Sequence, residues 1–122
     1  MSGDNIVIDS SLIINLFNGE EKILSLIEGR NLFVSVISEI EVLSFAGLKQ
    51  QERQILRDFL DECFVVDLDP HIKDLTISIR SKSKMKLPDA IIAATAIYFD
   101  LPLFTMDKGF NRLENLNAVI IS

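Results

Sequence analysis

Four acidic residues from distant parts of the chain each follow an expected strand or open an expected helix. Asp9 comes directly after the apolar run NIVI, and Asp107 lies two residues beyond the run PLFT. Glu41 and Asp89 each fall in the first turn of an expected helix. Carboxylates gathered in one place repel one another and raise each other's pKa, and a protein that keeps such a cluster usually fills it with hard divalent cations. The four acids therefore indicate a candidate site for Mg²⁺ or Mn²⁺, whose chemistry would be metal-assisted hydrolysis.

Each of these acids also has a structural explanation, because helix starts favour acidic and hydroxyl residues. Asp89 follows a proline, which is favoured at the first helical position. Ser38 and Glu41 have the spacing of a capping box, in which the two side chains satisfy each other's backbone donors. Asp9 and Asp107 would each cap the helix or turn that follows. The pattern alone leaves both explanations open. It also does not exclude three other acids among the eighteen in the chain, namely Glu39, Asp67 and Asp69.

Strand and helix patterns alternate along the chain and predict the elements that position these acids. Strands are expected over residues 5–8, 31–36, 64–68, 102–105 and 118–122. Helices are expected over residues 11–17, 20–28, 38–46, 51–63, 70–81 and 88–100, with a short helical turn near 110–113. This alternation predicts an α/β fold, a three-layer α/β/α sandwich with a mainly parallel five-stranded sheet. Because sites in such folds lie outside the carboxyl ends of the strands, we expect the four acids at one rim.

Length and composition limit the class of protein. The 122 residues suit a single domain spanning 1–122. The formal net charge of −6 argues against a general basic grip on nucleic acid, although acids gathered around cations would weaken that objection. Cys63 is the only cysteine and is expected to be a buried, inert thiol. No apolar run reaches the roughly 20 residues of a membrane span, and the N-terminus does not look like a signal peptide, so we expect a cytoplasmic protein.

Basic residues are concentrated next to Asp89. The stretch RSKSKMK places them at alternate positions, and two more lie on the opposite flank of the expected site. A solvated loop is the ordinary explanation of such a run. A strip that follows the phosphates of a substrate is the alternative. The six candidate substrate-binding residues are Arg80, Lys82, Lys84, Lys86, Lys108 and Arg112.

Four segments, in order, resemble the successive motifs of the PIN-domain family. They are VIDSSLII, SVISEIEVL, LPDAIIAATAIYFDLPLFT and FTMDKGFNRLENLNAVII, and together they extend from about residue 6 to residue 121. Each motif is weak by itself, whereas the ordered set is fairly specific. Two positions depart from the more frequent family pattern, because Ser38 stands in place of threonine and Ser11 in place of asparagine. Neither departure removes an acid.

The resemblance implies a metal-dependent ribonuclease. It implies that Asp9, Glu41, Asp89 and Asp107 form the catalytic, metal-binding site, that Thr105 is a supporting hydroxyl, and that Mg²⁺ or Mn²⁺ is the cofactor. Small free-standing members of the family resemble the toxin halves of bacterial toxin–antitoxin pairs (VapC-like). The resemblance therefore also implies an RNA substrate, a homodimer and a cognate antitoxin that silences the site, with no membrane association.

Other functions fit the sequence less well. A phosphoacceptor receiver domain needs paired acids after its first strand and a lysine after its fifth, but serines follow Asp9 and no lysine follows the last strand. A haloacid-dehalogenase-type phosphatase needs a second aspartate at position 11, which is Ser11. The sole histidine, His71, is far in the chain from every motif and is expected to be a surface or capping residue. A noncatalytic binding scaffold on the same fold remains an alternative.

Overall fold

A parallel sheet of five strands runs through the centre of the computed structural model, which describes residues 4–122. The strands are β1 (Asn5–Ile8), β2 (Asn31–Ser35), β3 (Phe64–Val66), β4 (Leu103–Thr105) and β5 (Ala118–Ile120). Their order across the sheet is β3-β2-β1-β4-β5, and every neighbouring pair is parallel. The expected parallel sheet is confirmed, with β1 at its centre.

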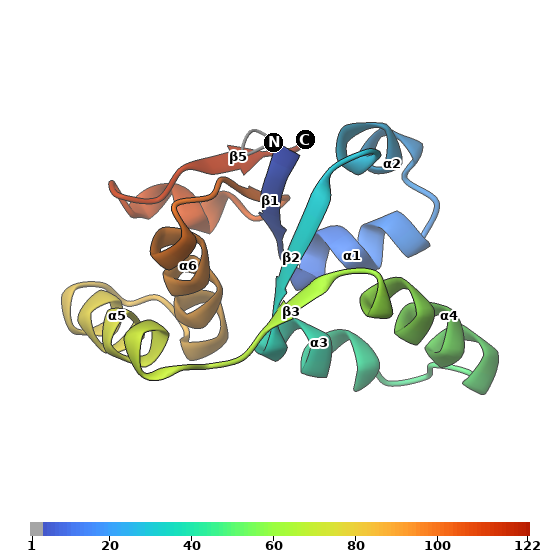
Figure 1. Ribbon diagram of the computed structural model, residues 1–122, viewed down its shortest axis with the longest axis horizontal. Coiled ribbons are helices and arrows are strands. Elements are labelled where there is room, and N and C mark those ends of the chain that lie inside the picture. Colours follow the sequence, from blue (N-terminus) through green and yellow to red (C-terminus); the bar gives the residue numbers. More distant parts are fainter. Residues whose placement is uncertain (1–3) are drawn as a thin grey trace.

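Helices cover both faces of this sheet (Figure 1). They are α1 (Ser10–Phe17), α2 (Glu21–Ile27), α3 (Val36–Leu43), α4 (Gln50–Asp61), α5 (Pro70–Lys82) and α6 (Leu87–Phe99), with a 3₁₀ helix, η2 (Lys108–Arg112), before β5. In Figure 1, α1, α2 and α4 lie on one side of the strands, and α5 and α6 lie on the other. The expected three-layer sandwich is therefore confirmed.

Alternating side chains of β1 supply both layers of the core, as the period of a strand requires. Ile6 and Ile8 are almost completely buried and pack in the cluster that includes Leu12 of α1. Val7, between them, is fully buried and packs with Ile92 of α6. The central strand thus has apolar contacts on both faces, which fixes its end, and the residue that follows it, at the rim of the sheet.

Helix α6 is apolar on all sides because it is buried within its layer. Every residue from Ala90 to Ala96 is buried, and the alanines among them permit close packing. The helix ends in a Schellman motif, in which Asp100 N–H donates to Ile97 O at 3.1 Å and Leu101 N–H donates to Ala96 O at 3.0 Å. Asp100 takes the left-handed conformation with φ of 54°. No helix within residues 4–122 is long and apolar enough to cross a membrane.

The start of α3 differs from the prediction. The helix begins at Val36, and the Ser35 hydroxyl caps it by accepting a hydrogen bond from Ile37 N–H at 3.2 Å. Ser38 is a fully buried residue within the first turn, and its Oγ has no hydrogen-bond partner among the described residues. The predicted capping box of Ser38 and Glu41 is therefore wrong, and Glu41 lies in the second turn. Ser38 cannot cap the helix because it shares the buried face of α3 with Val42, one turn further on.

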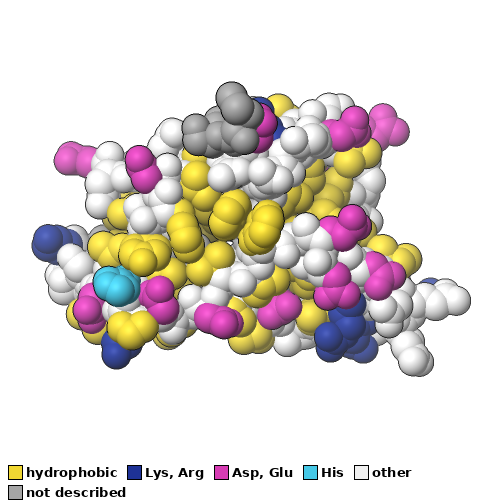
Figure 2. Space-filling view, viewed as in Figure 1, with side chains coloured by type: hydrophobic (Ala, Val, Ile, Leu, Met, Phe, Trp, Pro, Cys, Tyr) yellow, Lys and Arg dark blue, Asp and Glu magenta, His cyan; other side chains and the backbone are white. Residues whose placement is uncertain are grey.

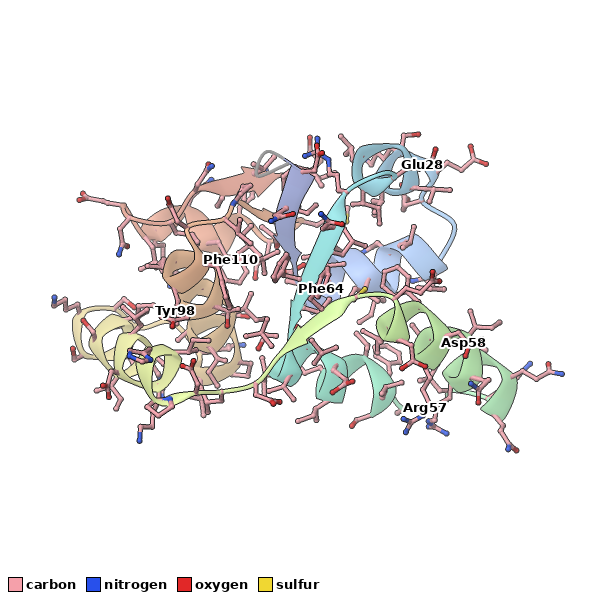
Figure 3. The ribbon with its side chains drawn as sticks, viewed as in Figure 1. Glu28, Arg57, Asp58, Phe64, Tyr98 and Phe110 are labelled. Carbon is pink, nitrogen blue, oxygen red and sulfur yellow. The ribbon has the colours of Figure 1, made fainter. Side chains whose placement is uncertain are left out.

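An aromatic row crosses the surface beside β3. His71 of α5 stacks on Tyr98 of α6 with ring centroids 5.5 Å apart, and Tyr98 meets Phe99 at 5.1 Å. Phe99 is 5.7 Å from Phe33, which in turn stacks on Phe64 at 5.0 Å. Figure 2 shows hydrophobic side chains gathered beside the histidine, and Figure 3 labels Phe64 on β3 and Tyr98 on α6. His71 is exposed, as expected, and belongs to this row.

Candidate active site

Asp9 is a buried carboxylate held at the end of β1. It caps α1, because Oδ1 accepts hydrogen bonds from Leu12 N–H at 3.0 Å and from the Ser11 hydroxyl at 2.9 Å. Its other oxygen, Oδ2, accepts from Thr105 Oγ1 at 2.5 Å. Burial raises the pKa of Asp9 above 3.8, its ordinary value, although these hydrogen bonds oppose the shift. The helix-capping role and a location at the rim are therefore found in the same residue.

Thr105 and Asp107 form the second part of the site, at the end of β4. Thr105 is completely buried, and besides donating to Asp9 it accepts a hydrogen bond from Asp107 N–H at 3.0 Å. Asp107 caps η2 through its Oδ1, which accepts from Gly109 N–H at 2.8 Å. A methyl group added at Gly109 would lie 3.1 Å from the same oxygen. Gly109 thus leaves the space that the Asp107 carboxylate occupies.

Asp89 lies in the first turn of α6, and its carboxylate is influenced by all three other acids. Burial raises its pKa most, followed by the negative charges of Asp107, Asp9 and Glu41, while Lys86 lowers it. Among the described residues no donor makes a hydrogen bond to this carboxylate. Its oxygens are therefore free for another ligand, and α6 begins at the same rim where β1 and β4 end.

Glu41 reaches this rim from α3. Its side chain is exposed, and its Oε1 accepts a hydrogen bond from the Ser10 hydroxyl at 2.5 Å. Ser10 directly follows Asp9 and is the first residue of α1. Sequence reasoning did not single out Ser10 or Gly109. Their only signal was their place next to, or two residues from, a candidate acid.

The four acids present only oxygen donors, which suit Mg²⁺ or Mn²⁺. Burial and then repulsion by the other three acids raise the pKa of Asp89, and a divalent cation would relieve that repulsion. Within residues 4–122, however, no three acidic, histidine or cysteine side chains lie close enough to hold one ion. The donor chemistry of the four acids therefore fits such a cation.

A cavity of about 220 Å³ opens beside two of these acids. Its polar lining combines Asp89 and Asp107 with Lys84, Lys86 and Arg112. Met85, Gly109 and Phe110 complete its walls. Three of the six predicted basic residues thus lie with the acids. The other three, Arg80, Lys82 and Lys108, do not line this cavity.

Cys63 and Phe110 have structural roles. Cys63 is partly buried, its thiol donates to Phe59 O at 3.4 Å, and burial raises its pKa to about 11, so it is inert. Phe110 is 1% exposed and packs against the α6 layer, as Figure 3 shows. The polar groups of the site are therefore carboxylates, hydroxyls and basic side chains.

The family model of the PIN domain matches residues 6–116. The chain belongs to the PIN domain family. No curated protein matches it by sequence. This PIN domain is 29% identical to a chain in a toxin–antitoxin complex from Klebsiella pneumoniae, with a TM-score of 0.82 over 93% of this chain and 95% of that chain.

Two further solved structures share the fold. A chain of VapBC2 from Rickettsia felis, bound to a DNA fragment from its promoter, has a TM-score of 0.82, 20% identity and coverage of 97% and 99%. A chain of VapBC-1 from nontypeable Haemophilus influenzae has a TM-score of 0.80, 20% identity and coverage of 95% and 97%. Of these three neighbours, one belongs to a toxin–antitoxin complex and the other two to VapBC structures.

Proposed function

We propose that this PIN domain is a Mg²⁺- or Mn²⁺-dependent endoribonuclease and the toxin component of a type II toxin–antitoxin pair that acts in the cytoplasm. The observation that carries the proposal is the cavity that Asp89 shares with Asp107, where burial and then the carboxylates of Asp107, Asp9 and Glu41 raise the pKa of Asp89. Four acids from four segments act on one another there, beside a cavity with basic walls. Membership of the family and the toxin–antitoxin neighbours support the same function.

In this proposal the residues of the chain would hold the cation, orient its ligands and neutralise the charge of the RNA. Asp89 and Asp107 hold the cation most directly, because they share the cavity. Asp9 and Glu41 complete its negative surroundings, and Thr105 fixes the rotamer of Asp9 through the hydrogen bond to Oδ2. A bound Mg²⁺ or Mn²⁺ supplies Lewis acidity, which activates water for attack on phosphorus and offsets charge on the leaving oxygen. Basic residues next to the site balance the charge of the RNA backbone.

The antitoxin partner rests on similarity and on one surface of the chain. A groove of about 370 Å³ between α1 and α4 is lined mainly by apolar side chains, and three of these, Phe17, Phe45 and Ile55, are strongly exposed. Ile23 of α2 and Leu56 of α4 are buried in the core, whereas Leu24 and Leu26 of α2 are exposed outside the groove. We assign the groove to an apolar segment of the antitoxin. A homodimer is also proposed, and sedimentation equilibrium of the purified protein tests it.

Cleavage of RNA is the direct test of the function. Purified protein, freed of any partner, is incubated with single-stranded RNA and Mg²⁺ or Mn²⁺, and again with EDTA. We expect metal-dependent cleavage that Asp89→Asn abolishes and that Asp58→Asn, a change of an exposed acid on α4, leaves intact. If no RNA is cut under any of these conditions, the enzyme proposal fails and a noncatalytic scaffold replaces it.

A further inference from the structure

The segment between α5 and α6 presents two lysines to the cavity because the residue between them is anchored. Met85 is 5% exposed and packs in the core with Ile79 and Ala90. Lys84 and Lys86, on either side of it, are exposed and line the cavity. In an extended chain, alternate side chains point to opposite sides, so burial of the middle residue directs both neighbours outward.

Hydrogen bonds hold this segment in place. Arg80 Nε donates to Met85 O at 3.3 Å, and Met85 N–H donates to Ser83 Oγ at 3.4 Å. Ser83 Oγ in turn donates to Ile79 O, in the last turns of α5, at 2.9 Å. Arg80 therefore has a structural bond that explains its absence from the cavity wall. The two lysines stand on a fixed segment, which lowers the entropy that ligand binding must overcome.

Arg112 forms the opposite wall. It is exposed at the end of η2, a helix that is fixed by the Asp107 cap at its start and by the buried ring of Phe110 at its centre. The cavity thus contains three positive charges against two negative ones, in a chain whose formal net charge is −6. Once a cation offsets the carboxylates, the positive charges of the walls are left to attract an anion.

The size and lining of the cavity limit what that anion is. A cavity of about 220 Å³ has room for a phosphate group. Among the described lining residues the one aromatic ring belongs to Phe110, which is almost completely buried and offers no face for base stacking. The contact is therefore with the backbone and is independent of base identity.

We propose that Lys84, Lys86 and Arg112 bind an RNA phosphate adjacent to the one that is cleaved, so that an efficient substrate carries at least two consecutive phosphodiesters. This inference rests on the proposed function, in which the acids and their cation take the scissile phosphate. It separates these three residues from Lys82 and Lys108, which are equally basic and exposed but lie off the cavity wall. Those two lysines are matched controls.

Binding is measured first, without cleavage. A fluorescein-labelled single-stranded RNA hexamer is titrated with Asp9→Asn protein in Mg²⁺, because asparagine keeps a capping oxygen for α1. Glu41→Gln protein, changed at an exposed residue, is a second background. We expect Lys84→Ala, Lys86→Ala or Arg112→Ala to weaken binding about tenfold each, as for hydrogen bonds to charged groups. The salt slope is expected to fall by about 0.7, the value for one phosphate on a single strand. Lys82→Ala and Lys108→Ala are expected to change affinity less than about twofold, as solvated charges do.

Cleavage is measured second, with a dinucleotide that has one phosphodiester and a trinucleotide that has two. For the unaltered protein we expect kcat/KM to be at least about tenfold higher for the trinucleotide, and we expect the Lys84, Lys86 and Arg112 variants to lose that preference. Equal kcat/KM for the two substrates overturns the inference, and so do equal binding losses for the wall residues and the controls. If no RNA is cleaved at all, the proposed function fails while the binding experiment still decides whether these residues hold a phosphate.

Discussion

Thr105 Oγ1 donates a hydrogen bond to Asp9 Oδ2 at 2.5 Å, which joins the ends of two neighbouring strands. The same hydroxyl accepts a hydrogen bond from Asp107 N–H, so one buried side chain positions two of the four acids. Asp9 caps α1 and Asp107 caps η2, so the Thr105 hydroxyl connects the end of β4 to the starts of both helices. The rim is therefore a connected structure before any ligand binds.

Replacing Thr105 tests this connection. Thr105→Val leaves a buried carboxylate oxygen without its donor, so we expect the free energy of unfolding in urea to fall by about 1.5–3 kcal/mol. Thr95→Val is the matched control, since Thr95 is also buried but donates to Ile91 O, a helix carbonyl with its own backbone partner. We expect the control to lose less than about 1 kcal/mol. Equal losses for the two variants would contradict a special role for the contact with Asp9.

The raised pKa of Asp89 predicts how stability depends on pH in EDTA. The folded protein holds a proton on this carboxyl more tightly than the unfolded chain, in which the pKa is near 3.8. Its contribution to stability is therefore most favourable below pH 3.8 and is lost as pH rises through the folded-state pKa. We expect Asp89→Asn to be more stable than the unaltered protein at pH 7 and equal to it near pH 3.5, measured by urea unfolding. A variant that is less stable at pH 7 would show that Asp89 is structural.

Divalent cations are expected to reverse this difference. Under the proposed function Mg²⁺ binds the folded protein only, so a concentration of 100 times Kd would add about 2.7 kcal/mol to the free energy of unfolding. We expect the melting temperature of the unaltered protein to rise with Mg²⁺ and that of Asp89→Asn to remain nearly constant. Differential scanning fluorimetry without RNA gives this readout independently of catalysis. Equal rises in both proteins would place the cation elsewhere.

Replacing Gly109 by alanine is expected to reduce activity while the fold is kept. In Gly109→Ala the new methyl group would press on Asp107 Oδ1, at 3.1 Å, and turn the carboxylate. We expect RNA cleavage to fall about tenfold, equivalent to about 1.4 kcal/mol of transition-state stabilisation. Stability in urea should change by less than about 1 kcal/mol. Asn111→Ala, at an exposed position of the same helix, is the control and should keep full activity. Undiminished cleavage by Gly109→Ala would separate Asp107 from the reaction.

Asp100 offers a gain in stability. It takes the left-handed conformation at the end of α6, with φ of 54°, where glycine has no steric penalty. We expect Asp100→Gly to raise the free energy of unfolding by about 0.5–1 kcal/mol. The reverse change, Gly29→Ala, should lower it by about 1 kcal/mol, because Gly29 has φ of 80° and nothing within 4 Å that a methyl group could contact. A fall in stability for Asp100→Gly would contradict the strain argument.

Much of the fold follows from local patterns in the sequence. The alternation of apolar runs with amphipathic segments predicts all five strands and six helices of residues 4–122, because burial on both faces of a parallel sheet leaves a strong periodic signal. The start of α3 does not follow, since SVISEIE offers two hydroxyl residues as caps. Only the packing of Ser38 on the buried face decides between them.

The site is less predictable than the fold because its contacts are long-range. The sequence places Asp9 after one strand and Thr105 in another, but it does not state that those strands are neighbours. The sequence also does not distinguish which of the six basic candidates lie at the site. Met85 is buried in the core, and this places Lys84 and Lys86 at the cavity. The local sequence pattern does not predict that Met85 is buried.

The position of β1 has a consequence for how the protein is made. Of the five described strands, β1 is synthesised before the other four, yet it lies in the middle of the sheet and one of its two neighbours is β4, which begins at Leu103. A chain still growing on the ribosome therefore keeps one edge of β1 unpaired until β4 has been added, an exposure that invites aggregation. A product terminated before Thr105 lacks the hydroxyl that orients Asp9, so the rim cannot form until β4 has been synthesised.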